Sequence, residues 1–168
     1  MNCSQVRVLL LVLTSIILAS TSFASAQIVA LGHSAVRDPF VVENEMWPAV
    51  LEAMLRGRGS QVHVTNAGIA GETTTGTLSR VSGSVPDGTR IVILMDNGYN
   101  DGRKCNCDTA ANMAAIHNQL KARGVKVIDA MDIYISVLKQ PGMAVVDGKH
   151  LSVEGNKKVA TILAGMVK

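Results

Sequence analysis

The sequence predicts an α/β fold, a three-layer α/β/α sandwich around a parallel sheet of four to five strands. Short, almost wholly apolar runs recur along the chain, and each gives way to glycine or polar residues. Segments with apolar residues at helical spacing lie between these runs. Strands that alternate with helices in this way are typical of βαβ units, which build parallel sheets.

Four apolar runs are the predicted strands. They are residues 28–31, a run that begins at Val62 and Val64 and stops at residues 66–68, residues 91–95, and residues 125–128. The run Ile91–Met95 is the most apolar of the four. Strands buried on both faces read as continuous apolar runs, so we expect this one to be central.

Apolar spacing and capping residues predict four helices. They cover residues 45–58, residues 73–81, a segment from 108 or 109 to about 123, and a last helix capped by Ser152. The expected buried face of the last helix includes Val159, Ile162, Leu163 and Met166. Residues 130–146 give no readable pattern, and no repeat or linker divides the chain.

A secretory signal peptide is predicted for residues 1–26. Arg7 is its only charged residue, residues 8–19 are almost wholly apolar, and Ala24-Ser25-Ala26 offers small residues for cleavage after Ala26. The apolar stretch is short for an uncleaved membrane anchor. We therefore expect a periplasmic or secreted protein whose residues 27–168 form one domain.

Composition argues against several classes of partner. The formal net charge of +3 falls to +2 once Arg7 is removed, and the cations are scattered along the sequence. Neither nucleic acid nor a membrane surface is indicated by so small a charge. The four aromatic residues outside the leader are too few for base-stacking platforms. We expect a monomer without stable membrane insertion.

Two cysteines remain in Lys104-Cys105-Asn106-Cys107. They form either two free thiols or one local disulfide in a surface loop, and an oxidising compartment permits the disulfide. A metal ion would need further ligands that the neighbouring sequence does not supply.

Chemically distinctive residues follow four of the apolar runs. Ser34, Gly71, Asn100 and the pair Asp147 and His150 come in this order along the chain. The carboxyl ends of parallel strands meet at one edge of a sheet, where ligands bind. A hydroxyl nucleophile, a glycine amide, a carboxamide donor and an imidazole with a nearby carboxylate are the groups that acyl transfer requires.

Four motifs carry a resemblance to a known family. They are Gly32-His33-Ser34, Asn66-Ala67-Gly68-Ile69-Ala70-Gly71-Glu72-Thr73, Gly98-Tyr99-Asn100-Asp101 and Asp147-Gly148-Lys149-His150-Leu151-Ser152. Together, and with Trp47-Pro48-Ala49-Val50-Leu51, they resemble the SGNH (GDSL-type) hydrolase superfamily, most closely its small periplasmic esterases, thioesterases and lysophospholipases. The resemblance implies a flavodoxin-like sheet, with one of the family's usual five strands absent because the chain is short after Val125.

The resemblance also implies a role for each residue of the predicted site. Ser34 would attack the acyl carbonyl, His150 would act as the general base and acid, and Asp147 would orient the imidazole. The amides of Ser34 and Gly71, with the Asn100 side chain, would form the oxyanion hole. The motifs call for no metal ion and no organic cofactor.

The chain departs from the family pattern beside the nucleophile, where His33 replaces the usual aspartate. The leading hypothesis is a serine hydrolase of small esters or thioesters, acting on an acylated envelope glycan or a lysolipid. The alternative is a catalytically impaired module of the same fold that binds glycans or acyl chains. A flavodoxin-like cofactor binder is disfavoured, because no phosphate-binding glycine pattern follows the first strand.

Overall fold

The computed structural model describes residues 27–167, so the predicted signal peptide lies outside the described residues. The elements, in chain order, are β1 (Gln27–Gly32), the 3₁₀ helix η1 (Glu43–Glu45), α1 (Trp47–Gly57), β2 (His63–Gly68), α2 (Thr74–Ser84), β3 (Thr89–Met95), α3 (Asp101–Lys104), α4 (Thr109–Ala122), β4 (Lys126–Asp129), α5 (Met131–Leu138) and α6 (Val153–Leu163).

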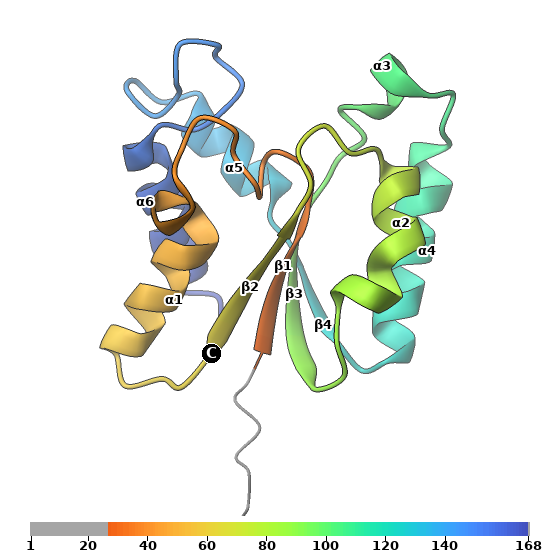
Figure 1. Ribbon diagram of the computed structural model, residues 1–168, viewed down its shortest axis with the longest axis horizontal. Coiled ribbons are helices and arrows are strands. Elements are labelled where there is room, and N and C mark those ends of the chain that lie inside the picture. The colour runs from red at the N-terminus through yellow and green to blue at the C-terminus, as the bar shows by residue number, and fades with distance from the viewer. Residues whose placement is uncertain (1–26, 168) are drawn as a thin grey trace, which may run out of the picture.

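The four strands form one parallel sheet in the order β2-β1-β3-β4. The strands β1 and β3 are central, and Ile93, Leu94 and Met95 of β3 are buried, as the apolar run predicts. All four strands run in the same direction, and the loops that follow them gather at the upper edge of the sheet in Figure 1. This edge carries every residue of the predicted site.

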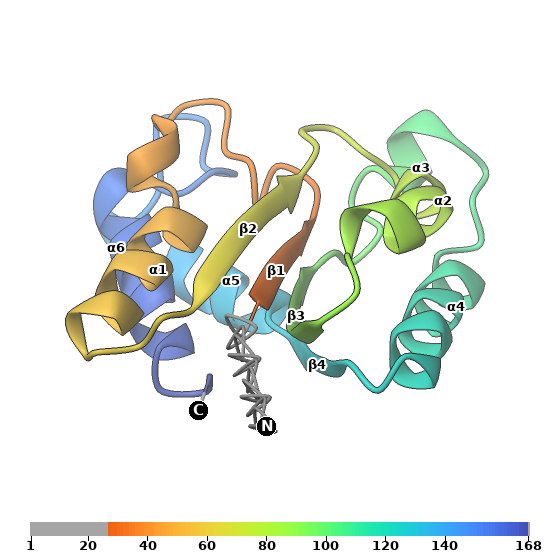
Figure 2. The same cartoon turned by 60° about the horizontal axis from the view of Figure 1, so that its bottom comes forward.

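Helices cover both faces of the sheet. The helices α1, α5 and α6 pack on one face and α2 and α4 on the other, with the strands between them (Figures 1 and 2). The predicted three-layer α/β/α sandwich with a four-stranded parallel sheet is therefore confirmed. A fifth strand is not present among residues 27–167: Ala130 alone separates β4 from α5, and no strand lies between α5 and α6.

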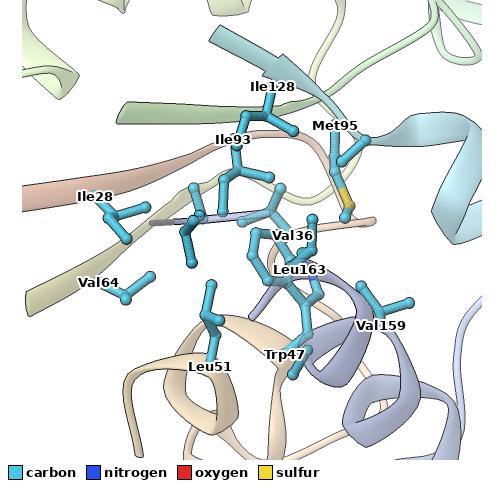
Figure 3. Close-up of a cluster of buried hydrophobic side chains, with 14 of the residues drawn as sticks. Ile28, Val36, Trp47, Leu51, Val64, Ile93, Met95, Ile128, Val159 and Leu163 are labelled. Carbon is cyan, nitrogen blue, oxygen red and sulfur yellow. The ribbon is translucent and has the colours of Figure 1, made fainter. Parts of the chain in front are cut away.

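The larger core lies between the sheet and α1, α5 and α6. Trp47 is fully buried at its centre, beside Leu51 of the same helix and Leu163 of α6 (Figure 3). The Trp47 indole Nε1 donates to Ala35 O at 2.8 Å, so the side chain also reaches the loop after β1. A tryptophan buries a large apolar area and usually finds a partner for its N–H. This residue thus connects the core to the loop that carries Ser34.

The predicted caps Asp108 and Ser152 are present: each accepts a hydrogen bond from an amide in the first turn of α4 and α6, respectively. Thr73, predicted as the first residue of a helix, instead caps α2 by accepting from the Gly76 amide. Residues 130–146, which had no readable pattern, contain α5.

The expected buried face of α6 is wrong in part. Val159 and Leu163 are buried, whereas Ile162 and Met166 are about two-fifths exposed. The buried stripe is completed by Gly155, Asn156 and Ala160, at helical spacing with Val159 and Leu163. Asn156 is buried because its Oδ1 accepts from the Trp47 amide at 2.9 Å. The buried face of α6 therefore contains the polar residue Asn156, and Ile162, which apolar spacing predicts to be buried, lies largely outside that face.

Candidate active site

A cavity of about 530 Å³ opens at the carboxyl edge of the sheet. Ser34, Gly71, Asn100 and His150 all line it. The fifth predicted residue, Asp147, does not line the cavity but hydrogen-bonds His150. The fold thus brings together side chains from four loops that are far apart in the sequence.

Ser34 lies on a tight turn directly after β1. The amides of Val36 and Arg37 both donate to His33 O, at 3.0 and 3.2 Å, which curls the chain back beneath Ser34. Gly32, with φ of +150°, starts this turn against β3: a Cβ there would lie 2.2 Å from Met95 O. Only glycine allows so close a backbone approach.

His33 directly precedes Ser34 and is 4% exposed. Its Nδ1 accepts from the Ala35 amide at 3.2 Å, so the neutral ring carries its proton on Nε2. That Nε2 faces Asp96 Oδ1 at 3.9 Å, beyond hydrogen-bond distance. Burial lowers the pKa of His33, although Asp96 opposes the shift. The imidazole therefore supports the Ser34 turn in its neutral form.

Gly71 lies in the loop after β2 and has φ of +75°. This backbone conformation favours glycine and leaves the Gly71 amide without an acceptor among residues 27–167. Lys104 Nζ donates to Gly71 O at 2.6 Å and so connects the loop to α3. The Ser34 amide likewise has no acceptor in the described part of the chain.

A buried ion pair holds the loops after β1 and β2 together. Arg80 of α2 pairs with Glu72, and its guanidinium also donates to Gly32 O at 3.2 Å and Ala67 O at 2.9 Å. One side chain therefore fixes the ends of two adjacent strands. Sequence analysis did not predict this role, because a single arginine on a helix has no distinguishing pattern.

Asn100 begins the short helix α3 after β3. Its Nδ2 donates to Glu72 O at 2.8 Å. A carboxamide nitrogen has two donor hydrogens, so one remains for another acceptor. Asp101 stabilises this segment: its carboxylate accepts from Thr74 N at 2.8 Å, and from Thr74 Oγ1 and Thr109 Oγ1, each at 2.6 Å. These bonds lower the pKa of Asp101 despite its desolvation.

Asp147 and His150 form a pair within one turn. His150 Nδ1 lies 2.6 Å from Asp147 Oδ2, and the amides of Lys149 and His150 donate to Asp147 Oδ1 at 2.8 and 3.0 Å. Desolvation alone would raise the pKa of Asp147, but these hydrogen bonds lower it to about 2. A carboxylate can only accept, so Nδ1 carries the proton and Nε2 is left as the basic nitrogen.

The residues around His150 fix the ring in place. Phe40 stacks at a tilt, with 5.2 Å between the two ring centroids. The backbone of residues 143–152 forms a narrow loop, in which Val145 N donates to His150 O at 2.9 Å and Ser152 N donates to Met143 O at 2.8 Å. The imidazole is thus held by the chain on both sides of it.

Ser34 and His150 line the same cavity without a hydrogen bond between them. No described residue hydrogen-bonds Ser34 Oγ. Contacts between a nucleophile and its base are often long in unliganded enzymes and tighten when substrate binds. The arrangement therefore supplies the groups for acyl transfer in an open geometry.

The two cysteines form a disulfide at the end of α3. Ligand atoms of Asp101, Cys105 and Cys107 lie within 4.8 Å of one another. In the disulfide the two sulfurs are bonded to each other and offer no thiolate to a metal. The predicted alternative of a local disulfide is the one that the structure contains.

Comparisons with known proteins agree with this fold and these motifs. No family model matches the chain. It is 27% identical to esterase TesA of Pseudomonas aeruginosa over 116 residues, 68% of this chain and 58% of TesA. It is 33% identical to an arylesterase of Vibrio mimicus over 85 residues, 51% of this chain and 42% of that protein. The chain thus matches about half the length of these relatives.

Solved structures show the same fold. A crystal structure of TesA superposes with a TM-score of 0.71 at 20% identity, covering 84% of this chain and 98% of that one. AlinE4, an SGNH-hydrolase family esterase, superposes with a TM-score of 0.61 at 23% identity, covering 85% of this chain and 95% of that one. The fold, the four motifs and the esterase relatives together support the predicted resemblance to the SGNH (GDSL-type) hydrolase superfamily.

Proposed function

We propose that the chain is a serine hydrolase that cleaves small carboxylic esters or thioesters through an acyl-enzyme on Ser34. One observation carries the proposal: Ser34, Gly71, Asn100 and the Asp147–His150 pair surround one cavity. The esterase relatives are consistent with this reaction class. A serine hydroxyl is a weak nucleophile alone, so the pair beside it is essential to the proposal.

In the first half-reaction, Ser34 Oγ bonds to the carbonyl carbon while His150 Nε2 takes the hydroxyl proton. The developing imidazolium is stabilised by Asp147 through the 2.6 Å contact at Nδ1. The tetrahedral intermediate then collapses, the bond to the alcohol or thiol breaks, and His150 returns the proton to that leaving group. The product is an ester between Ser34 and the acyl group.

In the second half-reaction, water replaces the leaving group. His150 takes a proton from water as the water oxygen bonds to the acyl carbon, and returns it to Ser34 Oγ when the ester breaks. The unoccupied amides of Ser34 and Gly71 and the second hydrogen of Asn100 Nδ2 would bind the oxyanion in both steps. Loss of one such donor usually costs about 100- to 1000-fold in rate.

A fluorophosphonate probe and a chromogenic ester test the proposal together. We expect the probe to label Ser34, and Ser34→Ala or His150→Ala to abolish hydrolysis of p-nitrophenyl acetate. Ser79→Ala is the matched control, because Ser79 Oγ only donates to Gly76 O on the exposed side of α2. A folded protein that neither reacts with the probe nor turns over the ester would refute the proposal.

A second candidate is a non-catalytic module that binds glycans or acyl chains. The observation that favours it is the nucleophile turn: His33 stands in place of the family's aspartate, and Ser34 Oγ has no partner among the described residues. Calorimetry with acyl ligands separates the two candidates. Binding without turnover that depends on Ser34 would support the module.

Cellular location and domain organisation complete the proposal. We infer that residues 1–26 direct export and are cleaved after Ala26, which leaves one domain, 27–168, in the periplasm or outside the cell. None of the described helices is long and apolar enough to cross a bilayer. N-terminal sequencing of the protein from the extracytoplasmic fraction tests this inference, and an uncleaved chain in the cytoplasm would contradict it.

The lining of the cavity also bears on which type of ester the protein would cleave. Four residues of α5 give the cavity a largely apolar wall: Met131, Tyr134, Ile135 and Leu138. Such a wall suits the acyl part of a lysolipid or of an acylated envelope glycan. A series of p-nitrophenyl and thioester substrates of increasing chain length, run beside Ser34→Ala, measures how much chain the cavity accepts.

A further inference from the structure

We propose that the rim of the active-site cavity docks on an anionic lipid surface. We use the word rim for two sets of residues at this edge. Tyr99, Arg103, Lys104 and Lys149 line the cavity itself, and Phe40, Val42, Ile69 and Val146 are exposed apolar residues in the loops at the same edge of the sheet. The inference goes beyond the proposed function and relies on it only for the use of the cavity as an acyl site.

The apolar half of the rim is the first observation. Seven large apolar residues are exposed among residues 27–167, and five of them lie in the loops at the carboxyl edge of the sheet. Val146 is completely exposed and Val42 is 62% exposed, while Phe40, at 57%, also contacts the His150 ring. The loops that carry them are at the top of Figure 1. Single exposed apolar residues are ordinary, but this concentration around one opening is not.

The three cations are the second observation. Arg103, Lys104 and Lys149 line the cavity, and no carboxylate in the described part of the chain forms a salt bridge with any of them. Lys104 donates to a backbone oxygen, and Arg103 lies 5.7 Å over the Tyr99 ring. A backbone carbonyl or an aromatic ring leaves the positive charge uncompensated.

The carboxylates near this edge are paired with cations or largely removed from the surface. Glu72 pairs with Arg80 and Glu43 with Arg37, Asp96 and Asp101 are buried, and the partly buried Asp147 hydrogen-bonds His150. The three rim cations are exposed, whereas these carboxylates are paired or largely buried, and the small net charge of the whole chain does not show this contrast. The sequence suggested no membrane surface because the three cations come from two loops that only the fold brings together.

Apolar loop tips interspersed with cations match an anionic bilayer. Apolar side chains can enter the region between head groups and acyl chains, while arginine and lysine attract the negative surface potential. The opening they surround leads to the apolar wall of α5, so a docked protein would receive an acyl chain without its passage through water. A lipid surface thus accounts for the apolar tips, the cations and the cavity together.

Co-sedimentation with lipid vesicles tests the proposal. The probe is Ser34→Ala protein mixed with vesicles of phosphatidylcholine alone or of equimolar phosphatidylcholine and phosphatidylglycerol, so that binding is measured without turnover. We expect binding to the mixed vesicles only, weakening as salt is raised because surface charges are screened. Equal binding to both vesicles, or none to either, overturns the proposal.

Two rim variants and two matched controls locate the surface. Arg103→Gln with Lys149→Gln should weaken binding about 25-fold, because each cation near an anionic surface contributes about fivefold. Phe40→Ser with Val146→Ser should weaken it about tenfold or more. One control removes two exposed cations at the opposite edge of the sheet, Lys121→Gln with Lys126→Gln. The other replaces two exposed apolar residues away from the rim, Ile162→Ser in α6 with Met166→Ser just after it. Controls as weak as the rim variants would contradict the assignment.

Self-association is the competing use of this surface. Sedimentation velocity of the same proteins decides it: a dimer that Phe40→Ser with Val146→Ser dissociates would overturn the proposal. Failure of docking is distinguishable from failure of the proposed function. Hydrolysis of soluble p-nitrophenyl acetate needs no lipid, and vesicle binding by Ser34→Ala needs no hydrolysis.

Discussion

The two halves of the candidate site are built in different ways. The acid–base half is local: Asp147 and His150 are three residues apart, and every bond to the Asp147 carboxylate comes from the same turn. The nucleophile half depends on remote segments. The Ser34 turn is held by Trp47 Nε1 through Ala35 O and by Arg80 through Gly32 O.

This difference coincides with where the chain departs from the superfamily that it resembles. The Asp147–His150 turn supplies the hydrogen bonds of its own carboxylate, and its residues match the family motif. The turn around Ser34 depends on remote supports, and His33, which differs from the family's aspartate, lies in that turn. We therefore expect changes in the acid–base half to remove chemistry directly, and changes in the nucleophile half to act through position and stability.

The largest expected effect is that of Asp147→Asn. The amide would disturb the tautomer that leaves Nε2 free, and kcat should fall by about 10³- to 10⁴-fold with little change in KM. Steady-state hydrolysis of p-nitrophenyl acetate measures the loss. Asp87→Asn, in a fully exposed turn far from the cavity, is the control. A loss below tenfold would show that His150 does not need its carboxylate partner.

The next effect is that of Asn100→Ala, which belongs to the nucleophile half. Removing the proposed oxyanion donor should lower kcat by about 100- to 1000-fold. The same side chain bonds Glu72 O, so thermal unfolding must be measured in parallel with the rate. Asn118→Ala, on the exposed side of α4, is the control. An unchanged kcat in a folded variant would remove Asn100 from the oxyanion hole.

The same contrast shows what sequence reasoning can reach. Strands and two helix caps were predictable, and so was the placement of the five candidate residues, because apolar period, capping residues and short motifs are local signals. Asp147 and His150 are neighbours in sequence, and Ser34, Gly71 and Asn100 each follow a strand. The order and placement of these residues predicted that they would meet at one edge of the sheet.

What sequence reasoning missed consists of contacts between distant residues. Arg80 reaches Gly32 O across 48 positions, and nothing in either segment predicts that contact. His33 facing Asp96 depends on the strands β1 and β3 being adjacent. Burial of Asn156 was missed for the same reason, because its partner, the Trp47 amide, lies on another helix. Contacts between residues that are far apart in the sequence leave no periodic pattern in it, so they cannot be inferred from spacing.

A third prediction concerns His33, the most altered position of the nucleophile half. His33→Leu leaves the buried Ala35 amide without an acceptor and should lower the free energy of unfolding by about 1–3 kcal/mol. His33→Asn keeps an acceptor oxygen near the Nδ1 position and should lose less. Urea denaturation at neutral pH measures both variants. Equal stability of His33→Leu and the unaltered protein would show that the contact contributes nothing.

We expect His33 also to make the free energy of unfolding of the protein depend on pH. Burial lowers the pKa of His33, and Asp96, Glu72 and His150 are the charged groups that act on it. His33 therefore binds a proton more readily in the unfolded chain than in the folded one. Its contribution to the free energy of unfolding is fully present above the ordinary histidine pKa of about 6.5, and it is lost as the pH falls from there toward the pKa of His33 in the folded state. His33→Asn should lose less stability than the unaltered protein between pH 7.5 and pH 5. Parallel losses in the two proteins would refute this origin of the acid sensitivity.

The smallest expected effect tests whether α3 supports the nucleophile half. The disulfide of Cys105 and Cys107 directly follows Lys104, whose Nζ holds Gly71 O. A bridge over one intervening residue closes a very short loop, so Cys105→Ser with Cys107→Ser should lower the free energy of unfolding by about 1.5 kcal/mol or less. Urea denaturation of this variant and of the protein with and without a thiol reductant measures the effect. Because the reductant acts only on the disulfide, the reduced protein and the double variant should coincide. If the reductant left stability unchanged while the double variant lost several kcal/mol, the cause would be packing of the side chains and not the covalent bond.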